Sequence, residues 1–301
     1  MNTNINFAGI KMKNPVTVAS GTFGYGREFA ELIDLNRLGG IITKGTSISP
    51  CPGNPPPRVC ETTGGMINAI GLQNPGLENF VKYDLPWLRQ FNTAIIVNAI
   101  GNSVEEYTEL CKMLNELDID GVELNLSCPN VKLGMAFGNT YDGVKEVTSK
   151  VREVLDKPLI VKLTPNVTDI TVTAKAAEDA GADAVSLINT ILSMAIDINT
   201  KRPILGINTG GLSGPCVKPI AIRMVYQVSQ AVKIPIMGMG GIMNGDDAIE
   251  FMLVGASAIS IGSGNFVSPD VSINTIKGIE EYMVRTNVDN ILDIVGNVKM
   301  N

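Results

Sequence analysis

The 301-residue chain contains no histidine. Because histidine is the side chain whose ordinary pKa lies nearest neutrality, any proton transfer must use cysteine, lysine, a carboxylate, tyrosine or serine. The five cysteines are odd in number and include no CxxC pair. That spacing gives no disulfide framework and no zinc or iron–sulfur ligand set, so we predict no metal site within this chain.

The chain also lacks a basic stripe and a long apolar run. It has 24 Lys and Arg against 30 Asp and Glu, for a net charge of −6, so nucleic acid is not an expected partner. No run of about 18 apolar residues occurs, which predicts no membrane span. The first residues show no basic segment followed by an apolar stretch, so we predict a cytoplasmic protein.

What the chain does have is a regular alternation of short apolar segments and amphipathic stretches. The apolar segments predict strands at 16–19, 40–43, 94–99, 121–126, 159–163, 184–188, 234–239 and 258–261. The amphipathic stretches predict helices at 28–36, 77–90, 104–117, 141–155, 170–180, 219–232, 245–254 and 272–285. Apolar strands of this kind are buried on both faces of a parallel sheet. Eight such units predict a (β/α)8 TIM barrel in a single domain over residues 1–301, with an N-terminal hairpin at 5–12. A doubly wound sheet is the alternative.

Two connections exceed ordinary strand-to-helix loops. Residues 44–76 contain SPCPGNPPPR and GGMINAIGLQNPG, and residues 189–219 contain RPILGINTGGLSGP. Both follow the carboxyl ends of strands, the face of a barrel that carries active sites. Long ordered loops there predict function, and the tail from Asn287 is expected to pack on the barrel exterior.

Polar residues and glycines stand at nearly every strand end. The two glycine-rich ends, Gly240-Gly241 and Gly262-Ser263, follow the last two strands, where barrels commonly bind phosphate through bare backbone N–H groups. Lysines at 44 and 162 need an anionic or electron-rich partner inside a barrel mouth. A phosphate site with an interior lysine predicts flavin mononucleotide (FMN), because a lysine can stabilise the negative charge of the reduced ring. Tight turns and strand-end caps are the alternatives.

The stretch from 121 to 138, GVELNLSCPNVKLGMAFG, is the most distinctive. Its strand alternates apolar residues with Glu123, Asn125 and Ser127, and Cys128 follows. Proline after Cys128 biases that cysteine away from helical dihedral angles. A thiol at a strand end, in a chain without histidine, is a candidate base.

Three segments together carry a family resemblance: NAIGLQNPG from Asn68, NLSCPNVK from Asn125 and MGMGGI from Met237. The chain resembles dihydroorotate dehydrogenase from Val16 to about Phe266, and cysteine in SCPN resembles class 1 of that family. The resemblance implies oxidation of dihydroorotate to orotate in pyrimidine biosynthesis. Cys128 would remove the C5 proton, and hydride would pass from C6 to N5 of FMN. It implies FMN contacts at Ser20, Lys44, Asn98, Asn125, Lys162, Ile188, Gly214, Gly240, Gly241, Gly262 and Ser263. It implies substrate contacts at Lys44, Asn68, Gly71, Leu72, Asn125, Asn130, Asn189 and Thr190.

Within class 1, NVK followed by AFG resembles the 1B type. That resemblance implies a separate subunit with FAD and a [2Fe-2S] cluster, electron transfer to NAD⁺, and a homodimer core within a heterotetramer. One departure is that VKLGMAFG has a single glycine after the lysine where the 1B loop usually has two. A fumarate-dependent 1A-type homodimer, a flavin-free barrel synthase or isomerase with a phosphorylated substrate, and a non-catalytic FMN-binding scaffold are the other hypotheses.

Overall fold

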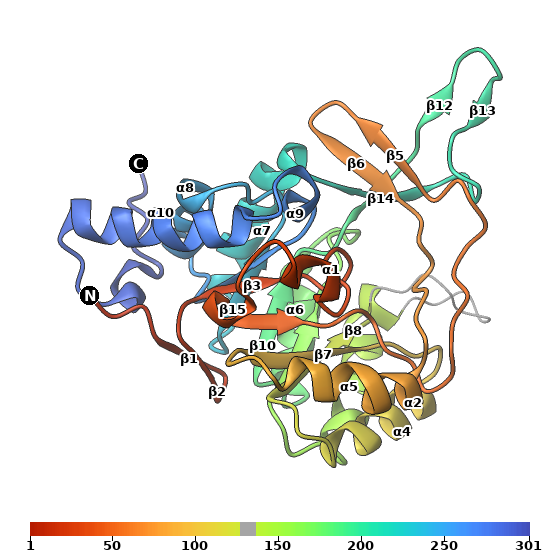
Figure 1. Cartoon of the computed structure of the whole chain (residues 1–301), viewed down its shortest axis with the longest axis horizontal. Coiled ribbons are helices and arrows are strands. Elements are labelled where there is room, and N and C mark those ends of the chain that lie inside the picture. Colours follow the sequence, from red (N-terminus) through yellow and green to blue (C-terminus); the bar gives the residue numbers. More distant parts are fainter. Residues whose placement is uncertain (127–136) are drawn as a thin grey trace.

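A closed barrel of parallel strands forms the centre of the computed structural model, which describes residues 1–126 and 137–301 (Figure 1). The barrel strands are β3 (Val16–Val18), β4 (Gly40–Ile42), β7 (Ala94–Ala99), β8 (Gly121–Asn125), β9 (Leu159–Lys162), β10 (Ala184–Leu187), β15 (Ile236–Met239) and β16 (Ala258–Ile261). Each strand pairs with the next in this order, and β16 pairs with β3 to close the ring. The predicted (β/α)8 barrel is confirmed, with every barrel strand within two residues of its predicted bounds.

Helices follow the barrel strands and cover them on the outside. The long ones are α4 (Val104–Asn115), α5 (Tyr141–Arg152), α6 (Ile170–Asp179), α7 (Lys218–Ser229), α8 (Gly245–Leu253) and α10 (Val271–Thr286), and consecutive members of this series contact one another. Helix α4 shows why they form here. The Ser103 hydroxyl accepts from the Glu106 backbone N–H, and acidic residues occupy the first turn. Its buried residues recur at helical spacing and face the barrel: Tyr107, Leu110, Cys111 and Leu114.

Shorter helical pieces fill the remaining connections. They are α1 (Arg27–Ala30), η1 (Leu35–Arg37), α2 (Leu77–Asn79), η2 (Phe80–Asp84), α3 (Leu85–Leu88), η3 (Phe137–Asn139), η4 (Pro215–Val217), α9 (Gly264–Val267) and η5 (Ile291–Ile294). The predicted single helix at 28–36 was wrong, because α1 ends early and η1 begins separately. The Asp34 side chain accepts from the Asn36 backbone N–H, which starts this second turn.

The two long loops build a second sheet that the sequence analysis did not predict. This sheet is antiparallel in the order β11 (Ile191–Ser193), β14 (Gly210–Ser213), β6 (Gly65–Asn68) and β5 (Val59–Thr62). A hairpin, β12 (Ile196–Asp197) with β13 (Arg202–Pro203), extends from it. Figure 1 shows these strands projecting from the barrel at the upper right. Ile67, Ala69 and Leu205 form a small core of their own beneath them.

The two chain termini pack against the barrel body. The predicted N-terminal hairpin is confirmed as β1 (Ile5–Phe7) and β2 (Ile10–Met12). Ile10 reaches the start of β8, since a Cβ built at Gly121 would lie 2.7 Å from its side chain. The expected packing of the tail is also confirmed, because Val298 donates through its backbone N–H to the Leu253 carbonyl at 3.0 Å.

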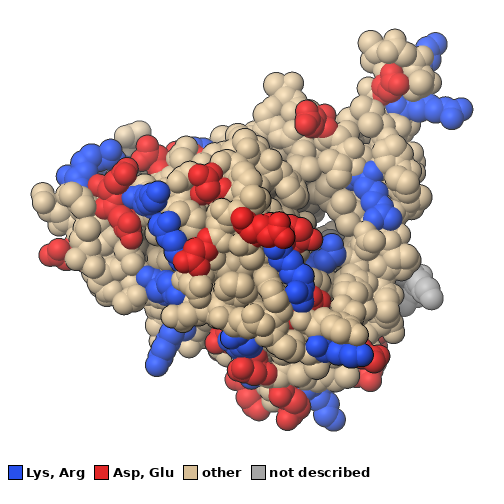
Figure 2. Space-filling model, viewed as in Figure 1, with Lys and Arg blue, Asp and Glu red and all other residues tan. Residues whose placement is uncertain are grey.

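Charged side chains of both signs are interspersed over the face shown in Figure 2. Nothing in that view forms a continuous basic stripe across the barrel. Of the helices in residues 1–126 and 137–301, none is long and apolar enough to cross a bilayer.

Candidate active site

The inward-facing positions of neighbouring barrel strands carry polar side chains at the carboxyl ends of those strands. Strand register pairs Asn98 with Glu123, Asn125 with Lys162, and Lys162 with Ser186. Residues paired across parallel strands point to the same face, so these side chains share the barrel interior. All of them are buried, and Glu123 and Asn98 are 0% exposed. Polar groups at this depth need partners, which the next contacts supply.

Glu123 is the centre of this buried cluster. Its Oε2 accepts from Asn98 Nδ2 at 2.5 Å, and its Oε1 accepts from the Ser186 hydroxyl at 2.7 Å. The Lys162 ammonium lies 3.6 Å from Glu123 Oε2. The lysine predicted at the mouth therefore has a buried acidic partner on the adjacent strand. Sequence analysis missed Glu123, although its place two residues before Asn125 on one strand puts both on the same face.

A chain of asparagine amides leads outward from Glu123. Asn125 Nδ2 donates to Asn98 Oδ1, and Asn189 Nδ2 donates to Asn125 Oδ1, each at 3.4 Å. Asn189 Oδ1 accepts from the Thr190 backbone N–H at 2.7 Å. The Tyr107 hydroxyl of α4 donates to the Asn125 carbonyl at 2.7 Å and so fixes the end of β8. Four predicted site residues are thereby linked from the interior to the loop after β10.

Lys44 stands at the same mouth, at the end of β4. Its backbone N–H donates to the Gly24 carbonyl at 2.9 Å, which holds the residue at the end of β4. The next residue, Gly45, approaches Asn98, since a Cβ built on it would lie 3.2 Å from Asn98 Oδ1. The half-buried Lys44 ammonium forms no ion pair or hydrogen bond with any residue that the structure describes. A cation in this position suits an anionic ligand.

The glycine-rich strand ends form a cradle with open backbone donors. Gly240 and Gly241 have φ values of 128° and 78°, which glycine adopts without strain. A Cβ at Gly241 would lie 2.7 Å from the Gly214 carbonyl, so this close approach also requires glycine. Within the described residues, no carbonyl or side chain accepts from the backbone N–H groups of Gly240, Gly241, Gly262 or Ser263. Such a set of donors suits the oxygens of a phosphate.

Gly262 differs from the other cradle glycines. A Cβ there would meet only Ala19 Cβ, at 3.9 Å, and the residue is not in the positive-φ region. Neither packing nor backbone geometry requires glycine at this position. The open space above it is what a closely approaching ligand needs. Ser20, also buried, lies close by, because the preceding Ala19 donates to the Ile261 carbonyl at 2.9 Å.

Asn265 aims the turn after β16. It is 1% exposed, and its Nδ2 donates to the carbonyls of Ile261 and Gly262, both at 2.9 Å. The Ser272 hydroxyl donates to Asn265 Oδ1 at 3.2 Å and fixes the amide from α10. Because Asn265 holds these two carbonyls toward itself, the backbone N–H groups of Gly262 and Ser263 can point away from it, toward the cradle. Sequence analysis missed Asn265 as well.

Lys218 lies near the cradle, but its charge is already used. A Cβ at Gly241 would lie 2.9 Å from Lys218 Cβ. Its ammonium contacts Asp247 at 2.5 Å and Glu250 at 2.7 Å. Burial lowers the pKa of Lys218, the hydrogen bonds to Asp247 and Glu250 raise it, and the balance lies above the ordinary lysine value. An anion in the cradle is therefore bound by backbone donors rather than by this lysine.

The second sheet places further predicted residues beside the mouth. Asn68 pairs with Gly211 in the register of β6 and β14, and its Nδ2 donates to the Gly211 carbonyl at 3.3 Å. A Cβ at Gly211 would lie 1.9 Å from Thr190 Oγ1, so Thr190 packs directly on this pair. Gly71 and Leu72 have φ values of 75° and 58° and lie in the following loop. No hydrogen bond between described residues joins Gly71 or Leu72 to the amide chain.

The remaining site predictions fall on two different parts of the chain. Ile188 contacts the cradle, because a Cβ at Gly240 would lie 3.3 Å from Ile188 Cγ1. Cys128 and Asn130 lie outside the described residues. The loop that contains Gly71 is held by Asn74, a residue that sequence analysis did not single out. Asn74 Nδ2 donates to the Leu72 carbonyl, and its Oδ1 accepts from the Gly76 backbone N–H, both at 2.9 Å.

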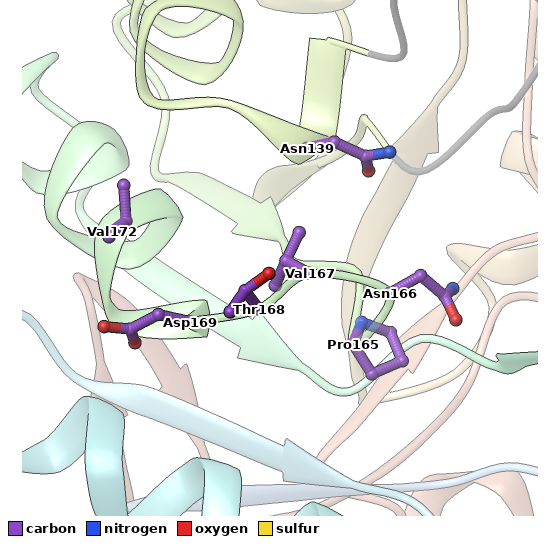
Figure 3. Close-up of a pocket in the computed structure, with 7 residues that line it drawn as sticks. All are labelled: Asn139, Pro165, Asn166, Val167, Thr168, Asp169 and Val172. Atoms are coloured by element: carbon purple, nitrogen blue, oxygen red, sulfur yellow. The ribbon is translucent and has the colours of Figure 1, made fainter.

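A groove of about 610 Å³ lies beside this site, between the loop after β9 and η3 (Figure 3). Its lining consists of Asn139, Pro165, Asn166, Val167, Thr168, Asp169 and Val172. The only acidic group among them, Asp169, accepts from the side chain and backbone N–H of Thr171, which lowers the pKa of Asp169. That carboxylate caps α6, and none of the described residues that line the groove carries a buried charge. The buried cluster and the cradle are therefore the better candidate for the active site.

Comparison with known proteins identifies the family. A family model described as dihydroorotate dehydrogenase matches residues 2–283. The chain belongs to the dihydroorotate dehydrogenase family. It is similar to three bacterial relatives, each named dihydroorotate dehydrogenase B (NAD(+)), catalytic subunit. The Alkaliphilus metalliredigens protein is 54% identical over 299 residues, covering 99% of both chains. The Lachnoclostridium phytofermentans protein is 55% identical over 300 residues, covering 99% of this chain and 100% of the relative. The Bacteroides fragilis protein is 55% identical over 294 residues, covering 97% of each.

This result confirms the resemblance inferred from the three sequence segments, and the chain is therefore an enzyme of the dihydroorotate dehydrogenase family. The match spans the barrel, the second sheet, the buried cluster around Glu123 and the glycine-rich cradle.

Proposed function

We propose that this chain oxidises dihydroorotate to orotate in de novo pyrimidine biosynthesis, with FMN bound at the barrel mouth in one unit over residues 1–301. Family membership supports the reaction. The main structural support for the site is the cradle of open backbone N–H groups. It lies at the same mouth as the asparagine amides and the Lys44 ammonium, which has no partner among the described residues. Phosphate donors, polar amides and a cation are what a flavin phosphate and a carboxylate substrate require together.

The residues of the mouth fit FMN. Backbone donors and open space above Gly262 suit its phosphate side, and the buried Lys162 suits a ring that gains negative charge. When bound, FMN supplies a hydride acceptor at N5, which no amino-acid side chain can provide. The residues that would hold it are Ser20, Lys44, Asn98, Asn125, Lys162, Ile188, Gly214, Gly240, Gly241, Gly262 and Ser263.

Amides and a lysine would hold the substrate. Dihydroorotate has two amide-like edges and a carboxylate, and each asparagine can both donate to and accept from such edges. The Lys44 ammonium, without an acidic partner in the described chain, would neutralise the carboxylate. The proposed set is Lys44, Asn68, Gly71, Leu72, Asn125, Asn130, Asn189 and Thr190.

Cys128 is the proposed base that removes the C5 proton. Its place follows from the sequence, since residues 127–136 are not described. An ordinary thiol ionises near pH 8.5, whereas a serine hydroxyl does not ionise in the working range. Cys128→Ser is expected to keep the fold and the flavin but to lose most turnover near neutral pH. Steady-state assays at equal flavin content test this, and activity like that of the wild type would remove Cys128 from the base role.

The electron acceptor is proposed from the relatives. Their names specify NAD(+) and a catalytic subunit, which supports a separate electron-transfer subunit with FAD and a [2Fe-2S] cluster. We propose a homodimer core of this chain within a heterotetramer, located in the cytoplasm. A fumarate-dependent 1A-type homodimer is the second candidate, because VKLGMAFG has a single glycine after the lysine where the 1B loop usually has two.

Anaerobic stopped-flow mixing of the purified chain with dihydroorotate tests the reaction and the acceptor together. The expected result is rapid bleaching of the oxidised flavin band. Fumarate should not reverse it, and NAD⁺ should reverse it only after the partner subunit is added. Reoxidation by fumarate would favour the 1A type. A chain that cannot be reconstituted with FMN, or that binds FMN and fails to bleach, would refute the proposed function and favour a flavin-free barrel enzyme.

A further inference from the structure

Glu123 is a buried carboxylate that no step of the proposed reaction uses. It is 0% exposed, and its neighbours are the Ser186 hydroxyl at 2.7 Å, the Asn98 amide at 2.5 Å and the Lys162 ammonium at 3.6 Å. All three neighbours present donors, so the surroundings fit an ionised carboxylate, which only accepts. An isolated charge is too costly at this depth, and Glu123 and Lys162 therefore exist as a mutually compensated pair.

This pairing changes what Lys162 does electrostatically. A lysine alone at the end of β9 would present a full positive charge to the barrel mouth. With a carboxylate 3.6 Å from the ammonium, the pair acts at longer range more like a dipole. A bound group that becomes negative on reduction is then stabilised less than it would be by the lysine alone. The effect is strong because little water enters this interior to screen it.

We propose that Glu123 is a positioning residue that sets the reduction potential of the flavin at this mouth. It holds Lys162 and Asn98 in place and cancels part of the positive charge of Lys162, which keeps the potential lower. The inference rests on the proposed function, because it requires FMN at the barrel mouth.

Glu123→Gln in the FMN-loaded protein tests the proposal, because glutamine keeps the shape and removes the charge. FMN content and the midpoint potential are measured at pH 7 by equilibration with a reference dye. We expect the variant to favour reduced over oxidised flavin at least tenfold, a shift of about 30 mV to more positive potential for a two-electron couple. Glu153→Gln is the matched control. Glu153 pairs with Lys150 on the outside of α5, so its loss is expected to leave the potential unchanged.

Two further variants separate charge compensation from a merely structural role. In a Lys162→Gln background, Glu123→Gln is expected to shift the potential much less, because a carboxyl group at this depth without its lysine partner would take up a proton and leave no charge to remove. Glu123→Asp keeps the charge but withdraws it by one methylene, so we expect a smaller positive shift. If Glu123→Gln fails to fold, the midpoint potential of Glu123→Asp is used to test the proposal instead.

Three results would overturn the proposal. The first is an unchanged or more negative potential in Glu123→Gln at wild-type FMN content, or in Glu123→Asp if that variant has to stand in. The second is a shift of the same size in the Lys162→Gln background. In both cases the proposed function stands as long as the wild-type protein binds FMN and its flavin is bleached by dihydroorotate. The third is a wild-type chain that cannot be loaded with FMN, which overturns the proposed function and this inference together.

Discussion

Replacing Gly262 by alanine tests whether the open space at the end of β16 receives the cofactor. The added Cβ would meet only Ala19 Cβ, at an ordinary contact distance of 3.9 Å, and the backbone is not in the positive-φ region. The flavin-free protein is therefore expected to gain about 0.4–1 kcal/mol, because alanine restricts the unfolded chain. The methyl group, however, stands beside the open backbone donors. Losing one hydrogen bond to a charged phosphate costs about 1.5–3 kcal/mol, which is roughly a ten- to hundredfold loss of FMN affinity.

Urea unfolding of the flavin-free protein measures the first effect, and quenching of FMN fluorescence on titration measures the second. Gly296→Ala is the matched control, since a Cβ there meets nothing within 4 Å, whereas its φ value is 75°. It is expected to cost about 1–2 kcal/mol of stability and to leave FMN affinity unchanged. Wild-type FMN affinity in Gly262→Ala would place the cofactor elsewhere. Destabilisation of the flavin-free Gly262→Ala protein would show that the space above Gly262 is already filled.

Three further predictions follow from single side chains. Asn265→Ala removes two buried hydrogen bonds to the turn after β16, so we expect a loss of about 1–3 kcal/mol in urea unfolding together with weaker FMN binding; unchanged FMN affinity would contradict the positioning role. Lys44→Met removes a cation that has no acidic partner among the described residues, so the free energy of unfolding should change by less than about 0.5 kcal/mol. Orotate binding, measured through the change in the flavin spectrum, should weaken at least tenfold. Equal orotate affinity would refute the ligand role. Burial raises the pKa of Cys111 to about 12, whereas Cys216 is exposed. Peptide mapping after iodoacetamide treatment at pH 8 should therefore find Cys216 modified and Cys111 unmodified until the protein unfolds. Prompt labelling of Cys111 in the native state would contradict its burial.

The barrel was predictable from the sequence because its strands carry a strong local signal. Strands buried on both faces are short apolar runs, and amphipathic helices with recognisable caps separate them. Ser103, which caps the start of α4, is an example. The second sheet gave no comparable signal. Its strands Gly65–Asn68 (GMIN) and Gly210–Ser213 (GGLS) show no alternation of apolar and polar residues. Asn68 also pairs with Gly211, more than a hundred residues away. Pairing over that separation is decided by the tertiary fold rather than by local pattern.

The candidate site was predictable where a motif marked a residue and not where burial decided its role. Lys162 stands out in an otherwise apolar strand, and Gly240 and Gly241 follow a strand end, so the sequence marked all three as candidates. Glu123 sits in an alternating strand, where an acidic residue is usually assigned to the solvent face. In a closed barrel that face is the interior, and only the register with Asn98 and Lys162 shows that the carboxylate is buried among donors.

The buried Glu123 carboxylate also determines which end of each asparagine amide donates and which accepts, for the asparagines that the sequence motifs marked. An asparagine amide has distinct donor and acceptor ends, whereas an ionised carboxylate only accepts. Asn98 must therefore turn its Nδ2 toward Glu123, which leaves its Oδ1 to accept from Asn125 at 3.4 Å. Asn125 Oδ1 in turn accepts from Asn189 at 3.4 Å, so each amide sets the next. Glutamine at position 123 can present either the oxygen or the nitrogen of its own amide. Glu123→Gln therefore no longer dictates which way the amides of Asn98, Asn125 and Asn189 donate and accept, although the shape of the side chain is kept.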